Sequence, residues 1–136
     1  MSETDAALLA KEVSSLVQRL RLWTPARWAA AAEPWGTRAD LGRHLAQSLA
    51  DAAAETEGGP PRALPVLHPD LLVADQVAVA GDDLVRAGPD QQVVQAAVAH
   101  LLVHRFDLLG EEPPTTLGGA EAMRLGRLVC VSSAAR

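Results

Sequence analysis

Two histidines and an aspartate stand at helical spacing in the segment HLLVHRFD, residues 100–107. At 100° per residue, His100 and His104 lie about 40° apart around a helix, and Asp107 lies about 20° from His100. Neutral imidazoles four residues apart can bind one cation from the same side, a spacing that recurs in metal sites. The alternative is a pair of core or surface histidines, and the spacing alone leaves both interpretations open.

A third ligand would have to come from another helix, because catalytic zinc sites usually take three protein ligands and leave a position for water. The chain has four histidines, and the remaining two are His44 and His68. His68 precedes Pro69 in a proline-rich stretch, where a capping or turning role is expected. His44 lies about 60° from Leu41 on a predicted helix, at the edge of its apolar stripe. It is therefore the candidate third ligand.

Three roles are open for Asp107. It could be a fourth ligand, a partner outside the ligand set that fixes the tautomer of an imidazole, or an ion-pair partner for Arg105 or Arg43. Acid–base chemistry by these residues without a metal would need a substrate pocket, which the sequence does not reveal. No catalytic residue is assigned.

Composition narrows the class of protein. The 136-residue chain suits one domain with one core. Its net charge of −5 and its scattered arginines argue against nucleic-acid binding, which needs a basic stripe. Its apolar runs are shorter than the roughly 20 residues of a membrane span, and it lacks a secretory-signal pattern, so we expect a cytoplasmic protein. Cys130 is the only cysteine, which excludes an intrachain disulfide.

The elements that must position these residues are predicted as four long helices. The first carries Leu9, Val13, Leu16 and Leu20 at helical spacing, with Leu8 and Val17 widening the stripe and Ser2 with Asp5 as candidate caps. Between Thr24 and Gly36 we expect a short connecting helix. Three tryptophans in or beside this helix are expected to anchor it against the bundle: Trp23, Trp28 and Trp35. For one of these three, stacking against a ligand is the alternative.

The second long helix opens with a capping box of Thr37 and Asp40. Its buried stripe is Leu41, Leu45, Leu49 and Ala52, and the proline-rich stretch up to Pro69 ends it. A third helix is expected over about 70–87 and a fourth over about 89–109, separated by Gly88 and with Pro89 at its first position. The apolar stripe of this fourth helix is Val93, Val94, Ala97, Leu101 and Leu108. His104 falls inside the edge of that stripe, and His100 and Asp107 fall just beyond it.

These elements predict an all-α fold, an antiparallel four-helix bundle with a short tryptophan-rich connecting helix. We expect the bundle to occupy residues 1–114 and a C-terminal tail to occupy residues 115–136 of the same domain. The tail has a short helical patch followed by an apolar run that suits either an edge strand or a docking segment.

Two segments together resemble a known family. TPARWAAAAEPWGTRADLGRHLAQSLADAA, residues 24–53, is similar to the early part of the mycothiol-dependent maleylpyruvate isomerase-like branch of the DinB-like helical bundles. Trp35, Asp40, His44 and Leu45 match its order, with Gly36 as an extra residue after the tryptophan. HLLVHRFDLLGEEPP, residues 100–114, resembles the later motif, in which Glu or His precedes a His by four residues and an Asp follows by three. The resemblance covers most of residues 5–114.

The resemblance implies a divalent metal, typically zinc or nickel, bound by His44, His100 and His104, with Asp107 outside the ligand set. It also implies a low-molecular-weight thiol that attacks an electrophilic small-molecule substrate during isomerisation or S-transfer. The chain departs from the family in the short stretch between His44 and His100, and in having His100 where a glutamate-type ligand is usual. It shows neither the accessory C-terminal domain of the isomerases nor an assignable pair of arginines to clamp a carboxylate. Three imidazoles by themselves suit zinc, nickel, copper or iron(II).

A different class of function is a non-catalytic bundle that forms a homodimer or docks a partner. The high alanine content would permit close approach of helices, and the apolar segment Leu117–Val131 could form part of such an interface. The two hypotheses are compatible, since a metal site can lie within a dimeric bundle.

Overall fold

The structure, a computed structural model, describes residues 3–109, and in this range every regular element is helical. The elements are α1 (Glu3–Leu20), α2 (Pro25–Ala29), α3 (Arg38–Glu57), the 3-10 turn η1 (Asp70–Leu72), α4 (Val73–Ala87) and α5 (Gln91–Leu109). The all-α class is confirmed for these residues. Ser2, Cys130 and the predicted tail, including Leu117–Val131, lie outside them.

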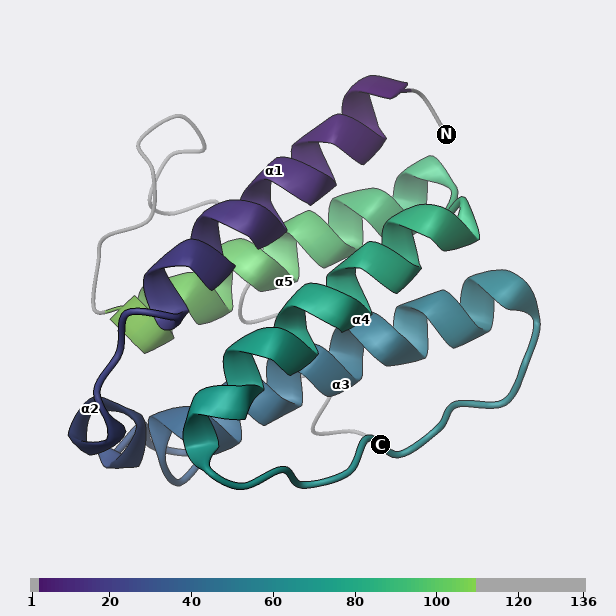
Figure 1. Cartoon of the computed structure of the whole chain (residues 1–136). Coiled ribbons are helices and arrows are strands. Elements are labelled where there is room, and N and C mark those ends of the chain that lie inside the picture. Colours follow the sequence, from purple (N-terminus) through teal and green to yellow (C-terminus); the bar gives the residue numbers. More distant parts are fainter. Residues whose placement is uncertain (1–2, 110–136) are drawn as a thin grey trace.

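The four long helices lie side by side, as Figure 1 shows. α3 packs against α4, α4 against α1, α1 against α5, and α5 against α3. α3 and α4 run in the same direction: their first turns lie together, so that a Cβ on Gly42 would lie 2.6 Å from Val73 Cγ1. α1 and α5 also run in the same direction as each other. Two of the four neighbouring pairs, α1 with α4 and α3 with α5, therefore run in opposite directions. The arrangement is not the simple antiparallel alternation that the sequence suggested.

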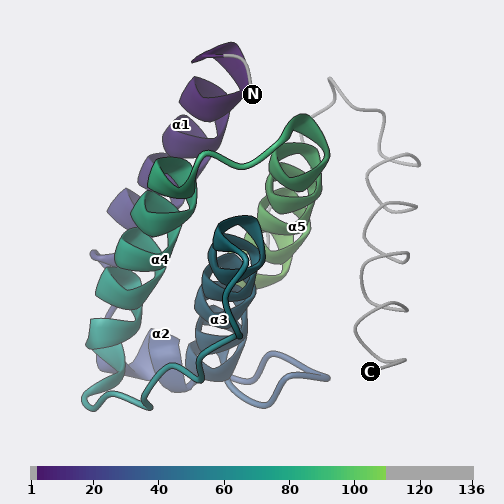
Figure 2. The ribbon, with the colours of Figure 1, turned by 90° about the vertical axis from the view of Figure 1, so that its right-hand side faces the viewer.

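The proline-rich connector between α3 and α4 causes this departure, because it leads back along the molecule before α4 begins (Figures 1 and 2). Between Glu57 and Asp70 it forms neither helix nor strand, and side chains of α3 and α4 hold it by hydrogen bonds. The Gln47 amide nitrogen donates to the Arg62 carbonyl at 2.9 Å, and the Gln47 amide oxygen accepts from the Leu64 N–H at 2.8 Å. The Gln76 amide nitrogen donates to the Pro65 carbonyl at 2.7 Å.

The helix ends follow their local sequence, with one correction. The capping box at the start of α3 is confirmed: Thr37 Oγ1 accepts from the Asp40 N–H at 3.2 Å, and Asp40 Oδ2 accepts from the Thr37 N–H at 3.0 Å. The predicted start of the last helix at Pro89 is wrong by two residues. Asp90 Oδ1 accepts from the Val93 N–H at 2.9 Å, so Asp90 caps the helix and α5 begins at Gln91.

The core lies between the long helices and largely matches the predicted stripes. In α1 the stripe is buried, but Leu8 is 45% exposed and does not widen it, whereas Val17 does. In α3 Ala53 is buried where Ala52 was expected, and in α5 Val93 is only partly buried. Trp23 and Trp28 are buried and anchor the connection between α1 and α3, as predicted. None of the described helices is long and apolar enough to span a membrane.

Candidate metal centre

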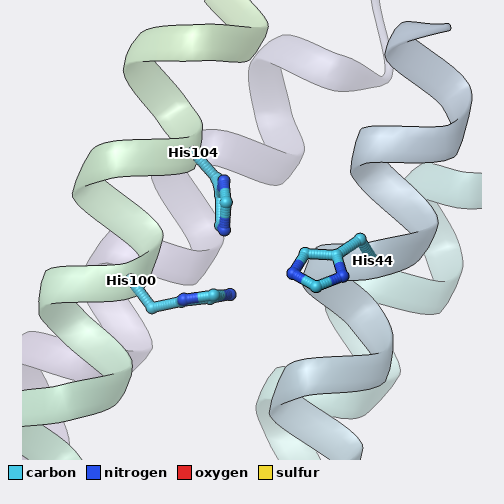
Figure 3. Close-up of side chains that lie close together, drawn as sticks. All are labelled: His44, His100 and His104. Carbon is cyan, nitrogen blue, oxygen red and sulfur yellow. The ribbon is translucent and has the colours of Figure 1, made fainter. Parts of the chain in front are cut away.

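Three histidines from two helices face one another across the contact between α3 and α5 (Figure 3). His44 lies in the second turn of α3, and His100 and His104 lie on successive turns of α5. Because α3 and α5 run in opposite directions, the first half of one helix meets the second half of the other. The structure thus brings together the three residues that the sequence proposed as ligands.

The geometry of the cluster is compact. One ring nitrogen from each histidine lies within 4.8 Å of the others. The ring centroids are 4.1 Å apart for His100 and His104, 5.3 Å for His44 and His104, and 5.6 Å for His44 and His100. Three nitrogens bound to one zinc ion at 2.0–2.1 Å would lie about 3.4 Å apart in a tetrahedral site. The nitrogens would therefore have to approach one another by at most about 1.4 Å to reach this spacing.

The imidazole nitrogens are buried without hydrogen-bond partners. Within residues 3–109, the Nε2 atoms of His44, His100 and His104 have no partner, and neither does Nδ1 of His104. A buried polar group that makes no hydrogen bond costs about 1–3 kcal/mol, so such groups are rare unless something compensates them. A cation among the three Nε2 atoms would satisfy all of them at once. The donor set therefore fits a divalent metal.

Burial also keeps these rings uncharged. Burial, with a smaller contribution from His100 and His44, lowers the pKa of His104 to about 3. Burial, with a smaller contribution from His44, lowers the pKa of His100 to about 4. Burial lowers the pKa of His44 as well, although the Asp51 carboxylate opposes that effect. At neutral pH all three imidazoles are in the neutral form that binds metals.

Asp107 lies beside the cluster without joining it. Its Oδ2 is 3.9 Å from His104 Nδ1, which is too long for a hydrogen bond, and its side chain is 42% exposed. Burial of the carboxyl raises its pKa. Asp107 does not share the group of ligand atoms formed by the three histidines. Its role in fixing the His104 tautomer stays a prediction.

The ion pairs considered for Asp107 do not form, because both arginines have other partners. Arg43 binds Asp40 and Asp70 at 3.2 and 2.7 Å. Arg105 lies 3.7 Å from a Glu12 oxygen and donates to Ser15 Oγ at 3.1 Å, which ties α5 to α1.

Trp35 lies against the same cluster, whereas the sequence predicted it as one of three tryptophans that anchor the connecting helix, with ligand stacking as the alternative for one of them. Its ring centroid lies 4.3 Å from that of His44 and 5.3 Å from that of His104. Unlike Trp23 and Trp28 it is only partly buried. The signal in the sequence was its place in the same motif as His44, two residues before the cap of α3. His68 lies exposed in the connector and does not belong to the group formed by the other three histidines.

Comparisons of the chain with protein-family models, with curated proteins and with solved structures find no match. The resemblance to DinB-like bundles accordingly stays a prediction, and the geometry of the histidines carries the functional argument.

Proposed function

We propose that the protein binds one divalent metal ion through His44, His100 and His104. The observation that carries this proposal is the group of three buried Nε2 atoms, contributed by α3 and α5, that lack any hydrogen-bond partner in the described part of the chain. Zinc and nickel are the preferred metals, because three imidazoles suit both and because the resembled family uses them.

If the three histidines served packing alone, we would expect their ring nitrogens to form hydrogen bonds within the protein. A neutral imidazole has one N–H donor and one acceptor, so two neighbouring rings can share an N–H···N bond. No such bond joins any two of the three rings among residues 3–109. One cation, by contrast, would engage all three rings through the atoms that now lack partners.

The finer part of the proposal rests on the resemblance. We infer a DinB-like helical bundle that acts in the cytoplasm as a metal- and thiol-dependent transferase or isomerase. When bound, the cation would lower the pKa of a coordinating low-molecular-weight thiol, so that the thiolate exists at neutral pH. The chain contributes neutral imidazoles fixed on two helices, which leave the remaining coordination positions to the thiol. The substrate class is a small electrophilic molecule.

The metal proposal is tested by elemental analysis of protein purified without an affinity tag. We expect about one equivalent of zinc or nickel in the wild type and a trace in the His44→Ala/His104→Ala double variant. His68→Ala is the matched control, because it removes an exposed histidine outside the cluster and should retain the metal. Circular dichroism would verify that each variant is helical. Equal trace metal in all of these proteins would refute the proposal.

The thiol proposal needs a separate measurement. In the cobalt-substituted protein, addition of a low-molecular-weight thiol should change the visible absorption spectrum, because a sulfur ligand alters the coordination of the ion. An unchanged spectrum in protein that still holds cobalt would be consistent with the metal site but would refute thiol binding at that site.

A further inference from the structure

We propose that Trp35 is a positioning residue of the metal centre, whose indole holds the His44 imidazole in the orientation that directs Nε2 toward His100 and His104. The inference rests on the proposed metal site and deepens it. It adds to the site a residue that offers no ligand atom.

The contacts of Trp35 reach ligands on both helices. Its ring lies close over that of His44, with an angle of 32° between the planes, and it meets the ring of His104 edge-on at 85°. Tilted and edge-on arrangements at such short separations are attractive, because the positive edge of one ring meets the negative face of another. One indole therefore restrains an imidazole from α3 and an imidazole from α5.

His44 has little else to hold its ring. Metal-binding histidines usually donate their second ring N–H to a carboxylate or a carbonyl, and this bond fixes the orientation of the ring. Among the described residues, the buried Nε2 of His44 has no hydrogen-bond partner; the hydrogen bond at this position is made by its backbone carbonyl, which accepts from Ser48 Oγ at 3.0 Å. The ring contacts of His44 are with Trp35, His100 and His104. Trp35 thus supplies the restraint that a hydrogen bond would otherwise give.

Trp35 can act in this way because its own backbone is fixed. Its N–H donates to the Ala32 carbonyl at 2.8 Å, and the Ala32 N–H donates to the Gly36 carbonyl at 2.8 Å. Gly36 has a φ of 106°, in the region that favours glycine, and the capping box of Thr37 and Asp40 follows at once. The loop and the start of α3 therefore form one unit that carries both the indole and His44.

The test compares three variants of the full-length protein. Trp35→Leu keeps an apolar side chain but removes the aromatic ring, and Trp35→Phe restores a ring. Trp23→Leu is the matched control, because Trp23 is buried against Trp28 and no ring contact links it to a histidine in the described range. Zinc affinity is measured by competition with a chelator, and the ring-proton shifts of His44 are measured by NMR in metal-free protein.

We expect Trp35→Leu to weaken zinc binding by roughly 10-fold or more, as loss of an orienting partner does in other metal sites. Trp35→Phe should recover most of the affinity, and Trp23→Leu should lower thermal stability while leaving affinity within about twofold. The His44 ring protons should shift in Trp35→Leu and stay unchanged in Trp23→Leu.

Zinc affinity of a folded Trp35→Leu within about twofold of the wild type would overturn the inference. If the wild type bound no zinc, the proposed function would fail, and the NMR comparison would still judge the positioning role: unchanged His44 shifts in Trp35→Leu would reject it. Should Trp35→Leu not fold, Trp35→Met takes its place as the non-aromatic variant, and zinc affinity of a folded Trp35→Met within about twofold of the wild type would overturn the inference.

Discussion

The contacts of α1 with α4 and of α3 with α5 are built in opposite ways, although both pair helices that run in opposite directions. Between α1 and α4 a Cβ on Gly81 would lie 2.6 Å from Val13 Cγ1, so the helices approach closely over apolar groups. Between α3 and α5 three imidazoles meet, with ring nitrogens that have no partner among the described residues. The contact between α1 and α4 is a close apolar packing. The contact between α3 and α5 buries polar nitrogens without partners, which lowers the stability of the fold.

This difference indicates where stability and function reside. Apolar contacts between well-packed side chains stabilise the fold, whereas convergent unsatisfied nitrogens destabilise it unless a ligand compensates them. Proteins violate local packing rules mostly at functional sites and compensate elsewhere. We call α1 with α4 the α1–α4 half of the molecule and α3 with α5 the α3–α5 half. Substitutions in the α1–α4 half should therefore change the free energy of unfolding alone, and substitutions in the α3–α5 half should change ligand binding.

The largest effect on stability is expected from Leu84→Ala. Leu84 lies in α4 and is fully buried, so the substitution should lower the free energy of unfolding by about 2–5 kcal/mol. Chemical denaturation measures this loss, and elemental analysis should show the metal content unchanged. Loss of metal from a folded Leu84→Ala protein would show that the two halves are not separate.

The stability that the protein gains on binding metal should depend on the histidines of α3 and α5. At zinc concentrations near 100 times the Kd, binding should stabilise the wild type by about 2.7 kcal/mol, because the ion binds only the folded chain. His100→Ala should show no such gain, while His68→Ala should behave as the wild type. The measurement is thermal unfolding with and without zinc. An equal gain in His100→Ala would remove this residue from the ligand set.

Without metal, the same half should make the protein sensitive to acid. The folded-state pKa values of His104 and His100, about 3 and about 4, lie below the ordinary value of 6.5, so in this range the unfolded chain binds more protons. Stability is then fully present above pH 6.5 and is lost as the pH falls toward 4, by about 1.4 kcal/mol per pH unit for each such proton. Denaturation in the presence of a chelator measures the slope.

His104→Leu is the control for the acid effect, because it fills the site with an apolar side chain that cannot be protonated. Its stability should fall less steeply with pH than that of the wild type. An identical slope would mean that other groups cause the acid sensitivity.

The smallest effect is expected from Gly81→Ala, which probes the close approach of α1 and α4. Crowding against the stiff Val13 side chain should cost about 1–3 kcal/mol, and the better helix propensity of alanine should offset about 1 kcal/mol of this. Gly59→Ala serves as control, since no neighbouring atom lies within 4 Å of its added Cβ. A Gly81→Ala protein more stable than the wild type would show that the interface is looser than its geometry indicates.

Most of the local structure could be predicted from the sequence. The capping box of Thr37 and Asp40, the breaks in the helices and the common face of His100 and His104 all follow from residues within a few positions of each other. Two of the errors were also local: α5 is capped by Asp90 and begins at Gln91 rather than at Pro89, and Leu8 faces solvent. Helix caps and breaks depend on residues close together in the sequence, so they can be read from the sequence.

The sequence by itself determined that His100 and His104 share a helix face and made His44 a candidate partner; the tertiary structure decided that the three meet. It also decided the parallel course of α3 and α4, the place of Trp35 against His44, and the 3.9 Å that separates Asp107 from His104. Periodicity specifies which way a side chain faces on its own helix. Which side chains meet across helices depends on the direction of the connectors and on how the helices pack, which no local pattern encodes.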